Sequence, residues 1–140
     1  FLLRLNLGNP DDAAERALLA GRDRRELIAQ VSPLLDAQRI LALRQAVQAV
    51  HASDALLDYL QALLARSRKH PGVRVGLSPR AGLALLRAAR AHALLLGREH
   101  VLPEDVQALF PAVAEHRLVA EADATPATLA KQILHAVAVD

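Results

Sequence analysis

The residues Ser78, Pro79 and Arg80 form the most informative chemical feature of the sequence. Serine often caps a helix, and proline suits the first helical position because the N–H that it lacks is unpaired there. Arg80 would then lie in the first turn, beside the positive end of the helix dipole, where an acidic residue is more stabilising. A guanidinium together with free backbone N–H groups is suited to a phosphate. The segment therefore predicts that Arg80 contacts a phosphate.

The other residues whose side chains could bind a ligand or catalyse a reaction do not combine into a site. Arg87 could reinforce the positive field of Arg80, but a surface arginine with a packed stem is the simpler interpretation. The six histidines are spread along the chain without metal-ligand spacing, so no metal site is predicted. Asp54 and Asp58 could form an acid–base pair, but a first-turn acid explains Asp54 more simply. The chain has no cysteine and no phosphate-binding loop of the Gly-x-x-x-x-Gly-Lys-Ser/Thr type, so alone it should hydrolyse no nucleotide.

Composition and charge narrow the classes of partner. The chain has 17 Lys and Arg against 15 Asp and Glu, and only one Tyr and two Phe, a balance that argues against nucleic-acid binding. Arg66, Arg68, Lys69 and Arg74 form a local basic cluster, which we interpret as a solvated face rather than a nucleic-acid patch. No apolar run is long enough to span a bilayer, so no membrane partner is expected. The chain contains no Met and opens within an apolar run, which indicates a piece of a longer polypeptide.

The elements that position Arg80 are predicted to be helices. Alanine and leucine dominate the 53% of apolar residues and lose little side-chain freedom in a helix. Helices are expected over 11–20, 35–50, 54–69 and 79–96, and two more begin at Pro103 and Pro126. Each carries one apolar stripe that must face another helix. The sequence therefore predicts an all-α bundle of five or six helices.

Three segments differ from this pattern. The alternation in Phe1–Leu7 predicts a strand, whose partners would lie upstream because a lone strand is unstable in water. Without its sheet, this segment should be mobile, folded back on the bundle, or paired with another copy. Gly21–Pro33 is predicted to be a solvated connection with a turn of helix around Leu27. Val73–Leu77 is predicted to be a loop.

Several of these segments together resemble a known family. The sequences VHASDALLDY at 50–59, GLSPRA at 76–81 and VLPEDV at 101–106 occur in the order and spacing of the carboxy-terminal part of the MoxR family of AAA+ ATPases. The sequences FLLRL at 1–5 and GNP at 8–10 resemble the end of the ATPase core in that family. The likeness becomes thin after Leu118, and the segment around Arg80 is the most specific part.

The resemblance implies a residual core strand and linker at 1–9 and a helical lid domain at 10–140. Arg80 stands at the position of the sensor-two arginine, presented by Ser78 and Pro79, which would reach the γ-phosphate of ATP in the intact protein. ATP and Mg²⁺ would be held by the core, so the chain alone should bind no cofactor. The implied partners are its own core, a neighbouring subunit of a hexameric ring, and a protein with a von Willebrand factor A domain. The implied role is chaperone-like remodelling of client complexes in the cytoplasm.

The sequence departs from the family pattern at two places. Leu102 stands where the family usually has a threonine, and leucine cannot cap the next helix, so that start should be frayed or docked on the core. The arginine that could act on a neighbouring subunit would precede Phe1. The alternative function is a helical protein-interaction module that does not depend on nucleotide.

Overall fold

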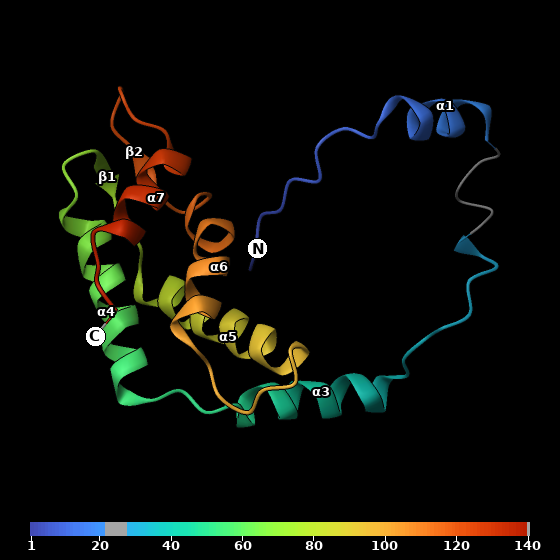
Figure 1. Ribbon diagram of the computed structural model, residues 1–140, viewed down its shortest axis with the longest axis horizontal. Coiled ribbons are helices and arrows are strands. Elements are labelled where there is room, and N and C mark those ends of the chain that lie inside the picture. Colours follow the sequence, from blue (N-terminus) through green and yellow to red (C-terminus); the bar gives the residue numbers. More distant parts are fainter. Residues whose placement is uncertain (22–27, 140) are drawn as a thin grey trace.

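The computed structural model describes residues 1–21 and 28–139, and its helices lie where the sequence predicts them (Figure 1). The helices are α1 (Asp12–Ala20), α3 (Ala37–Ala49), α4 (Asp54–Lys69), α5 (Pro79–Leu95), α6 (Pro103–Ala114) and α7 (Pro126–His135). With six helices in the described part of the chain, the predicted all-α bundle is confirmed. The predicted turn around Leu27 lies outside the described residues.

Short polar side chains fix the starts of most helices. Asp11, Asp36, Ser53, Ser78 and Thr125 each accept a hydrogen bond from the backbone N–H three residues further on. These bonds satisfy one of the N–H groups that every helix leaves unpaired at its first turn. The helix starts could be predicted accurately for this reason, since cap residues are local signals.

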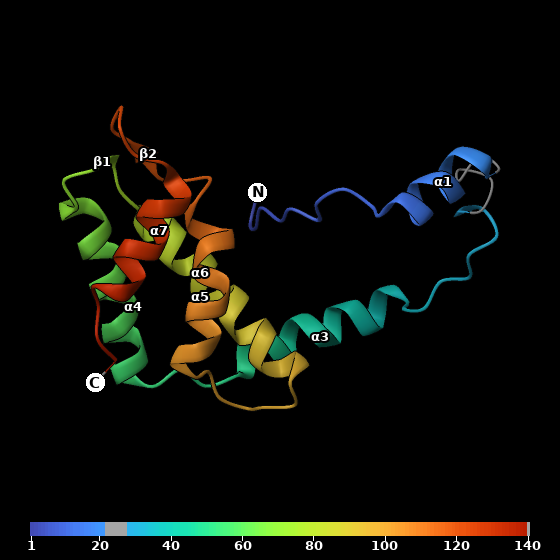
Figure 2. The same cartoon turned by 45° about the horizontal axis from the view of Figure 1, so that its top comes forward.

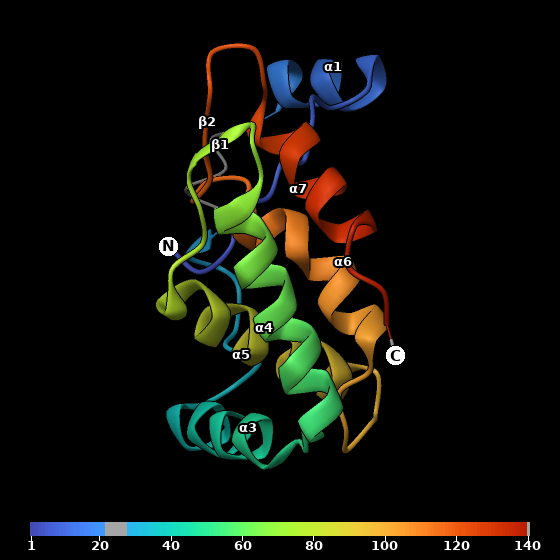
Figure 3. The same ribbon diagram turned by 90° about the vertical axis from the view of Figure 1, so that its left-hand side faces the viewer.

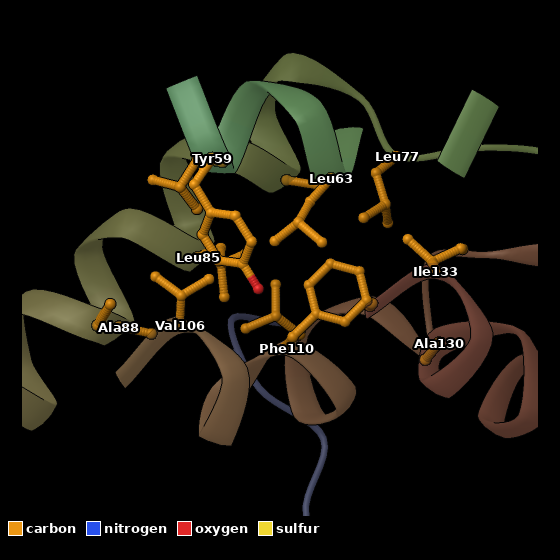
Figure 4. Packing of buried hydrophobic residues seen from close by; sticks show 14 of the residues in the cluster. Tyr59, Leu63, Leu77, Leu85, Ala88, Val106, Phe110, Ala130 and Ile133 are labelled. Atoms are coloured by element: carbon orange, nitrogen blue, oxygen red, sulfur yellow. The ribbon is translucent and has the colours of Figure 1, made fainter. Parts of the chain in front are cut away.

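The core lies where α4, α5, α6 and α7 meet (Figure 4). Leu63 of α4, Leu85 of α5, Phe110 of α6 and Ile133 of α7 are each at most 1% exposed. Burying one such side chain contributes about 1.5–3 kcal/mol before entropy is subtracted. The helix that carries Arg80 is therefore fixed against α4 and α6.

The buried face of α4 contains a tyrosine and a serine among its leucines. The buried residues of this helix are Leu56, Tyr59, Leu60, Leu63 and Ser67. Leu57 is 41% exposed, and Leu64 is half-buried. Tyr59 and Ser67 continue the spacing of three and four residues that the core requires, whereas Leu57 lies at the edge of that face. The position of Ser67 in the core matters for the candidate site.

The prediction of a loop over Val73–Leu77 is wrong in its first part. Strand β1 (Val73–Val75) pairs antiparallel with β2 (Val119–Ala120), and the register is irregular between Val73 and Val75. The small sheet lies at the end of α4 opposite α3 (Figure 3). Strands of two and three residues are too short to show an alternating pattern, so they cannot be predicted from hydrophobic periodicity.

The segment Phe1–Leu7 forms no strand in the structure. Instead the Arg4 N–H donates to the Ala112 carbonyl of α6 at 2.9 Å, and the Arg117 guanidinium donates to the Phe1 carbonyl at 2.6 Å. Ala112 is among the last residues of α6, whose carbonyls lack partners within the helix. Leu3 also packs against the core. Of the three predicted fates, the one observed is folding back on the bundle.

The first third of the chain leaves most of its apolar side chains exposed. Neither α1 nor α3 buries a residue, and α1 stands apart from the bundle (Figures 1 and 2). The large apolar residues exposed in this region are Phe1, Leu2, Leu5, Leu7, Leu18, Leu19, Ile28, Val31, Leu34, Leu35, Ile40, Leu41 and Leu43. We call residues 1–36 the arm. None of the described helices has the length and hydropathy needed to cross a membrane.

Candidate functional site

The start of α5 has the cap predicted from the sequence. The Ser78 hydroxyl accepts from the Ala81 N–H at 3.3 Å, and Pro79 occupies the first position of the helix. Arg80 therefore lies in the first turn. The N–H groups of Ala81 and Gly82 also donate to the Ser78 carbonyl at 2.9 and 3.3 Å. Only the N–H of Arg80 has no partner within the described part of this turn, so the guanidinium is the main group that this site offers to an anion.

The Arg80 side chain is exposed and has no acidic partner at ion-pairing distance among the described residues. Both ion pairs found in residues 1–21 and 28–139 involve Asp105, in the first turn of α6. A cation beside the positive end of a helix dipole costs a few tenths of a kcal/mol when nothing neutralises it. The surroundings of Arg80 therefore suit a negatively charged group from outside the described residues.

The segment before the cap is attached to α4. Leu77 is buried, its N–H donates to the Ser67 hydroxyl at 2.9 Å, and its carbonyl accepts from the Arg68 side chain at 2.8 Å. A Cβ added at Gly76 would lie 2.7 Å from the Arg68 Cα, so only glycine permits this approach. These contacts define the position of the loop from which α5 begins.

The other basic residues are placed differently from Arg80. Arg87 is exposed and lines a hollow between α5 and α3 with Arg44 and Val47, so it faces α3 rather than the first turn of α5. Within the basic cluster, Arg68 binds the Leu77 carbonyl, whereas Arg66 has no such bond within the described chain. The structural role of Arg68 could not be read from the sequence, because its partner is nine residues away in a loop.

Asp105 explains how α6 begins without a cap from Leu102. Its buried carboxylate accepts from the Leu102 N–H at 2.8 Å and from both terminal nitrogens of Arg98 at 2.7 and 2.6 Å. The His92 Nδ1 lies 2.7 Å from the same carboxylate. The Arg98 guanidinium is the main cause that holds the pKa of Asp105 well below its usual range. The predicted fraying at Leu102 is therefore wrong, because an acid three residues later supplies the missing partner.

The site fits part of a nucleotide-binding arrangement. A guanidinium on a rigid helix start suits a phosphate oxygen, because it presents planar donors. The described residues contain no group of three or more His, Asp or Glu side chains that could hold a metal ion.

Comparison with known families identifies the class of this domain. The model of the AAA lid domain family matches residues 65–136, about half of the chain, including the whole of α5. The chain therefore belongs to the AAA lid domain family. A crystal structure of a candidate ATPase from Cytophaga hutchinsonii has the same fold, with a TM-score of 0.85 and 22% identity. The match covers 100% of this chain and 47% of that one.

Relatives with curated names identify the branch of the family. The chain is 34% identical over 124 residues to the uncharacterized protein YeaC of Bacillus subtilis, covering 89% of this chain and 39% of that protein. It is 31% identical over 143 residues to the chaperone MoxR1 of Mycobacterium tuberculosis (96% and 37%) and 35% identical over 140 residues to the protein MoxR of Methylorubrum extorquens (86% and 41%). The chain is the carboxy-terminal lid region of a MoxR-type AAA+ ATPase, as its motifs indicate, and it spans about two fifths of these relatives.

Proposed function

We propose that this chain is a lid that presents Arg80 to the γ-phosphate of ATP held by an ATPase core. The observation that carries the proposal is an exposed arginine, without an acidic partner in the described residues, on a capped and firmly attached helix start. A folded bundle that needed only stability would place an acid there. Membership of the AAA lid domain family supports the choice of nucleotide over other phosphate compounds.

The contribution of this chain to hydrolysis is electrostatic. ATP with Mg²⁺ supplies the phosphoryl group and its charge, and the core provides the phosphate-binding loop. The Arg80 guanidinium binds phosphate oxygens with two parallel N–H donors and offsets the charge that gathers on them in the transition state. Because Arg80 has no anionic partner to leave within the described residues, it can engage and release phosphate as the lid moves.

The division of the chain follows from the same proposal. Residues 1–9 would complete the core and 10–140 would form the lid, with residues 10–36 of the arm lying between the core and the bundle. The concentration of exposed apolar side chains in residues 1–43 supports this arrangement, because such side chains are usually covered by another protein surface. The covering surfaces would be the core of the same subunit and the neighbouring subunit of a hexameric ring.

The client role is proposed from the relatives. One relative is named a chaperone and others carry the name MoxR, and the chain would couple ATP hydrolysis to remodelling of client complexes. A partner with a von Willebrand factor A domain belongs to this proposal. So does a cytoplasmic location, where ATP is available.

The proposal is tested by ATP turnover in the intact parent protein. Losing a charge-assisted hydrogen bond of about 1.5–3 kcal/mol predicts that Arg80→Ala lowers kcat roughly 10- to 100-fold. Arg80→Lys should recover only part of the loss, because a point charge does not replace the guanidinium fork. Arg87→Ala is the matched control, being an exposed arginine on the same helix, and should keep kcat within about twofold. Unchanged turnover in Arg80→Ala, with partner binding that ignores ATP, would favour a nucleotide-independent interaction module.

A further inference from the structure

The backbone of Leu77, directly before the cap of α5, is hydrogen-bonded at both its N–H and its carbonyl by consecutive residues of α4. The Leu77 N–H donates to Ser67 Oγ at 2.9 Å, and the Leu77 carbonyl accepts from Arg68 Nε at 2.8 Å. Leu77 directly precedes Ser78, and Arg80 follows two residues later. Few freely rotating bonds therefore separate these two hydrogen bonds from Arg80, the residue that would touch phosphate.

Ser67 is an unusual residue for its place. It is 0% exposed among apolar side chains, where alanine would fill the space without a polar atom to satisfy. Its hydroxyl donates to the Leu64 carbonyl at 2.7 Å, which leaves its lone pairs free to accept from Leu77. The hydroxyl therefore connects the α4 backbone to the loop through one donated and one accepted hydrogen bond.

Close packing removes the remaining freedom of the segment. At Gly76 an added Cβ would lie 2.7–2.8 Å from the Arg68 backbone, and at Gly82 it would lie 2.6 Å from Leu64 Cδ1. The two glycines bracket the cap and bring the chain against the same turn of α4. The region around Ser67 and Arg68 therefore sets both the orientation and the position of the first turn of α5 relative to α4.

We infer that Ser67 is a positioning residue for Arg80, assisted by Arg68, and that it acts on ATP turnover by holding the Leu77 backbone. The inference rests on the proposed function of Arg80 as a phosphate contact. A guanidinium placed about 1 Å wrongly loses much of its effect on a transition state. Loss of either hydrogen bond should therefore lower turnover while the helices remain folded.

The test is a double-mutant cycle in the intact parent. Ser67→Ala and Arg68→Ala are each expected to lower kcat by about three- to tenfold in the wild-type background. Combined with Arg80→Ala, each should change kcat by less than about twofold, because the residue through which they act is gone. Arg68 is exposed, so its variant should fold even if Ser67→Ala proves unstable.

Two controls separate positioning from loss of stability. Arg66→Ala removes an exposed arginine two residues before Arg68 and should leave kcat unchanged. Val106→Ala weakens the core at α6, away from the Leu77 backbone (Figure 4), and should lower the melting temperature without lowering kcat. Helicity measured by circular dichroism confirms that each variant is folded at the assay temperature.

The outcomes distinguish the inference from the proposed function. Equal losses of kcat with and without Arg80 would overturn the positioning role and leave the phosphate contact standing. The same conclusion follows if Ser67→Ala and Arg68→Ala both keep full turnover while Arg80→Ala loses it. Full turnover in Arg80→Ala would overturn the phosphate contact and the positioning role with it.

Discussion

Asp105 stabilises the connection between α5 and α6 through several partners of one carboxylate. It is 1% exposed, and Arg98, His92 and the Leu102 N–H surround its carboxylate. Removing one partner of a buried ion pair is costly because the other charge is left uncompensated. The ionised form is therefore essential to the connection between α5 and α6.

The pKa of Asp105 gives a prediction about pH. Because the pKa in the folded chain lies below the unfolded value of about 3.9, the stabilisation is complete above that value and declines as pH falls further. Asp105→Asn should lower the free energy of unfolding by about 3 kcal/mol above pH 5. The difference between wild type and variant should shrink below about pH 4, as measured by urea unfolding across pH. A difference that grows on acidification would contradict this account.

At the residue scale the sequence predicted the cap of α5 correctly, because capping depends on residues three apart. The phosphate contact of Arg80 stays a prediction. Ser67 and Asp105 were missed, because a serine within a helix and an acid in a first turn look ordinary in sequence. Their partners lie up to 13 residues away and become neighbours only after the helices pack.

At the scale of elements, the contact between α4 and the loop before α5 depends on two glycines of unequal importance. At Gly76 an added Cβ would meet the backbone of Arg68, which cannot move independently of α4. At Gly82 it would meet only the end of the Leu64 side chain, which can change rotamer. Adding a methyl group should therefore lower the free energy of unfolding by different amounts at Gly76 and Gly82.

We predict that Gly76→Ala lowers the free energy of unfolding by about 2–3 kcal/mol and that Gly82→Ala lowers it by less than about 1 kcal/mol. Gly82→Ala also gains from the higher helix propensity of alanine, which offsets part of its strain. Chemical denaturation of the two variants side by side measures the difference. A larger loss at Gly82 would mean that the loop is not seated on the α4 backbone as described.

Helices were easier to predict than strands for a physical reason. The start of α4 follows from a local cap, and its length from a repeating apolar stripe. The pair β1 and β2 depends on residues more than forty positions apart and is too short to show a period. Proline usually ends or kinks a helix, yet α6 continues past Pro111 to Ala114, where the buried Phe110, Val113 and Ala114 support its last turn.

At the scale of the whole molecule, the arm and the bundle differ in how they are held. Among the described residues of the arm, only Leu3 packs against the core, although Arg4 and Phe1 are hydrogen-bonded to the bundle. The bundle contains every buried residue of the described chain. The stability of the domain should therefore depend little on residues 1–36.

Removal of residues 1–36 is predicted to leave a bundle that unfolds cooperatively, with a melting temperature within about 5 °C of the 140-residue chain. In the longer chain, amide exchange should be slow at Arg4 and fast from Asn6 to Asn9, since of these only Gly8 donates a hydrogen bond, and that to an exposed side chain. Calorimetry and hydrogen exchange check the two parts. Collapse of the bundle after truncation would show that the arm belongs to the folding unit.

The most direct test of the central claim is a structure of the intact parent with a non-hydrolysable ATP analogue and Mg²⁺ bound. The account predicts that the Arg80 guanidinium lies within hydrogen-bonding distance of the γ-phosphate, about 2.7–3.0 Å, with the Leu77 backbone still held by Ser67 and Arg68. An Arg80 side chain directed away from the nucleotide, or locked in an ion pair with an acid of the lid, would contradict it.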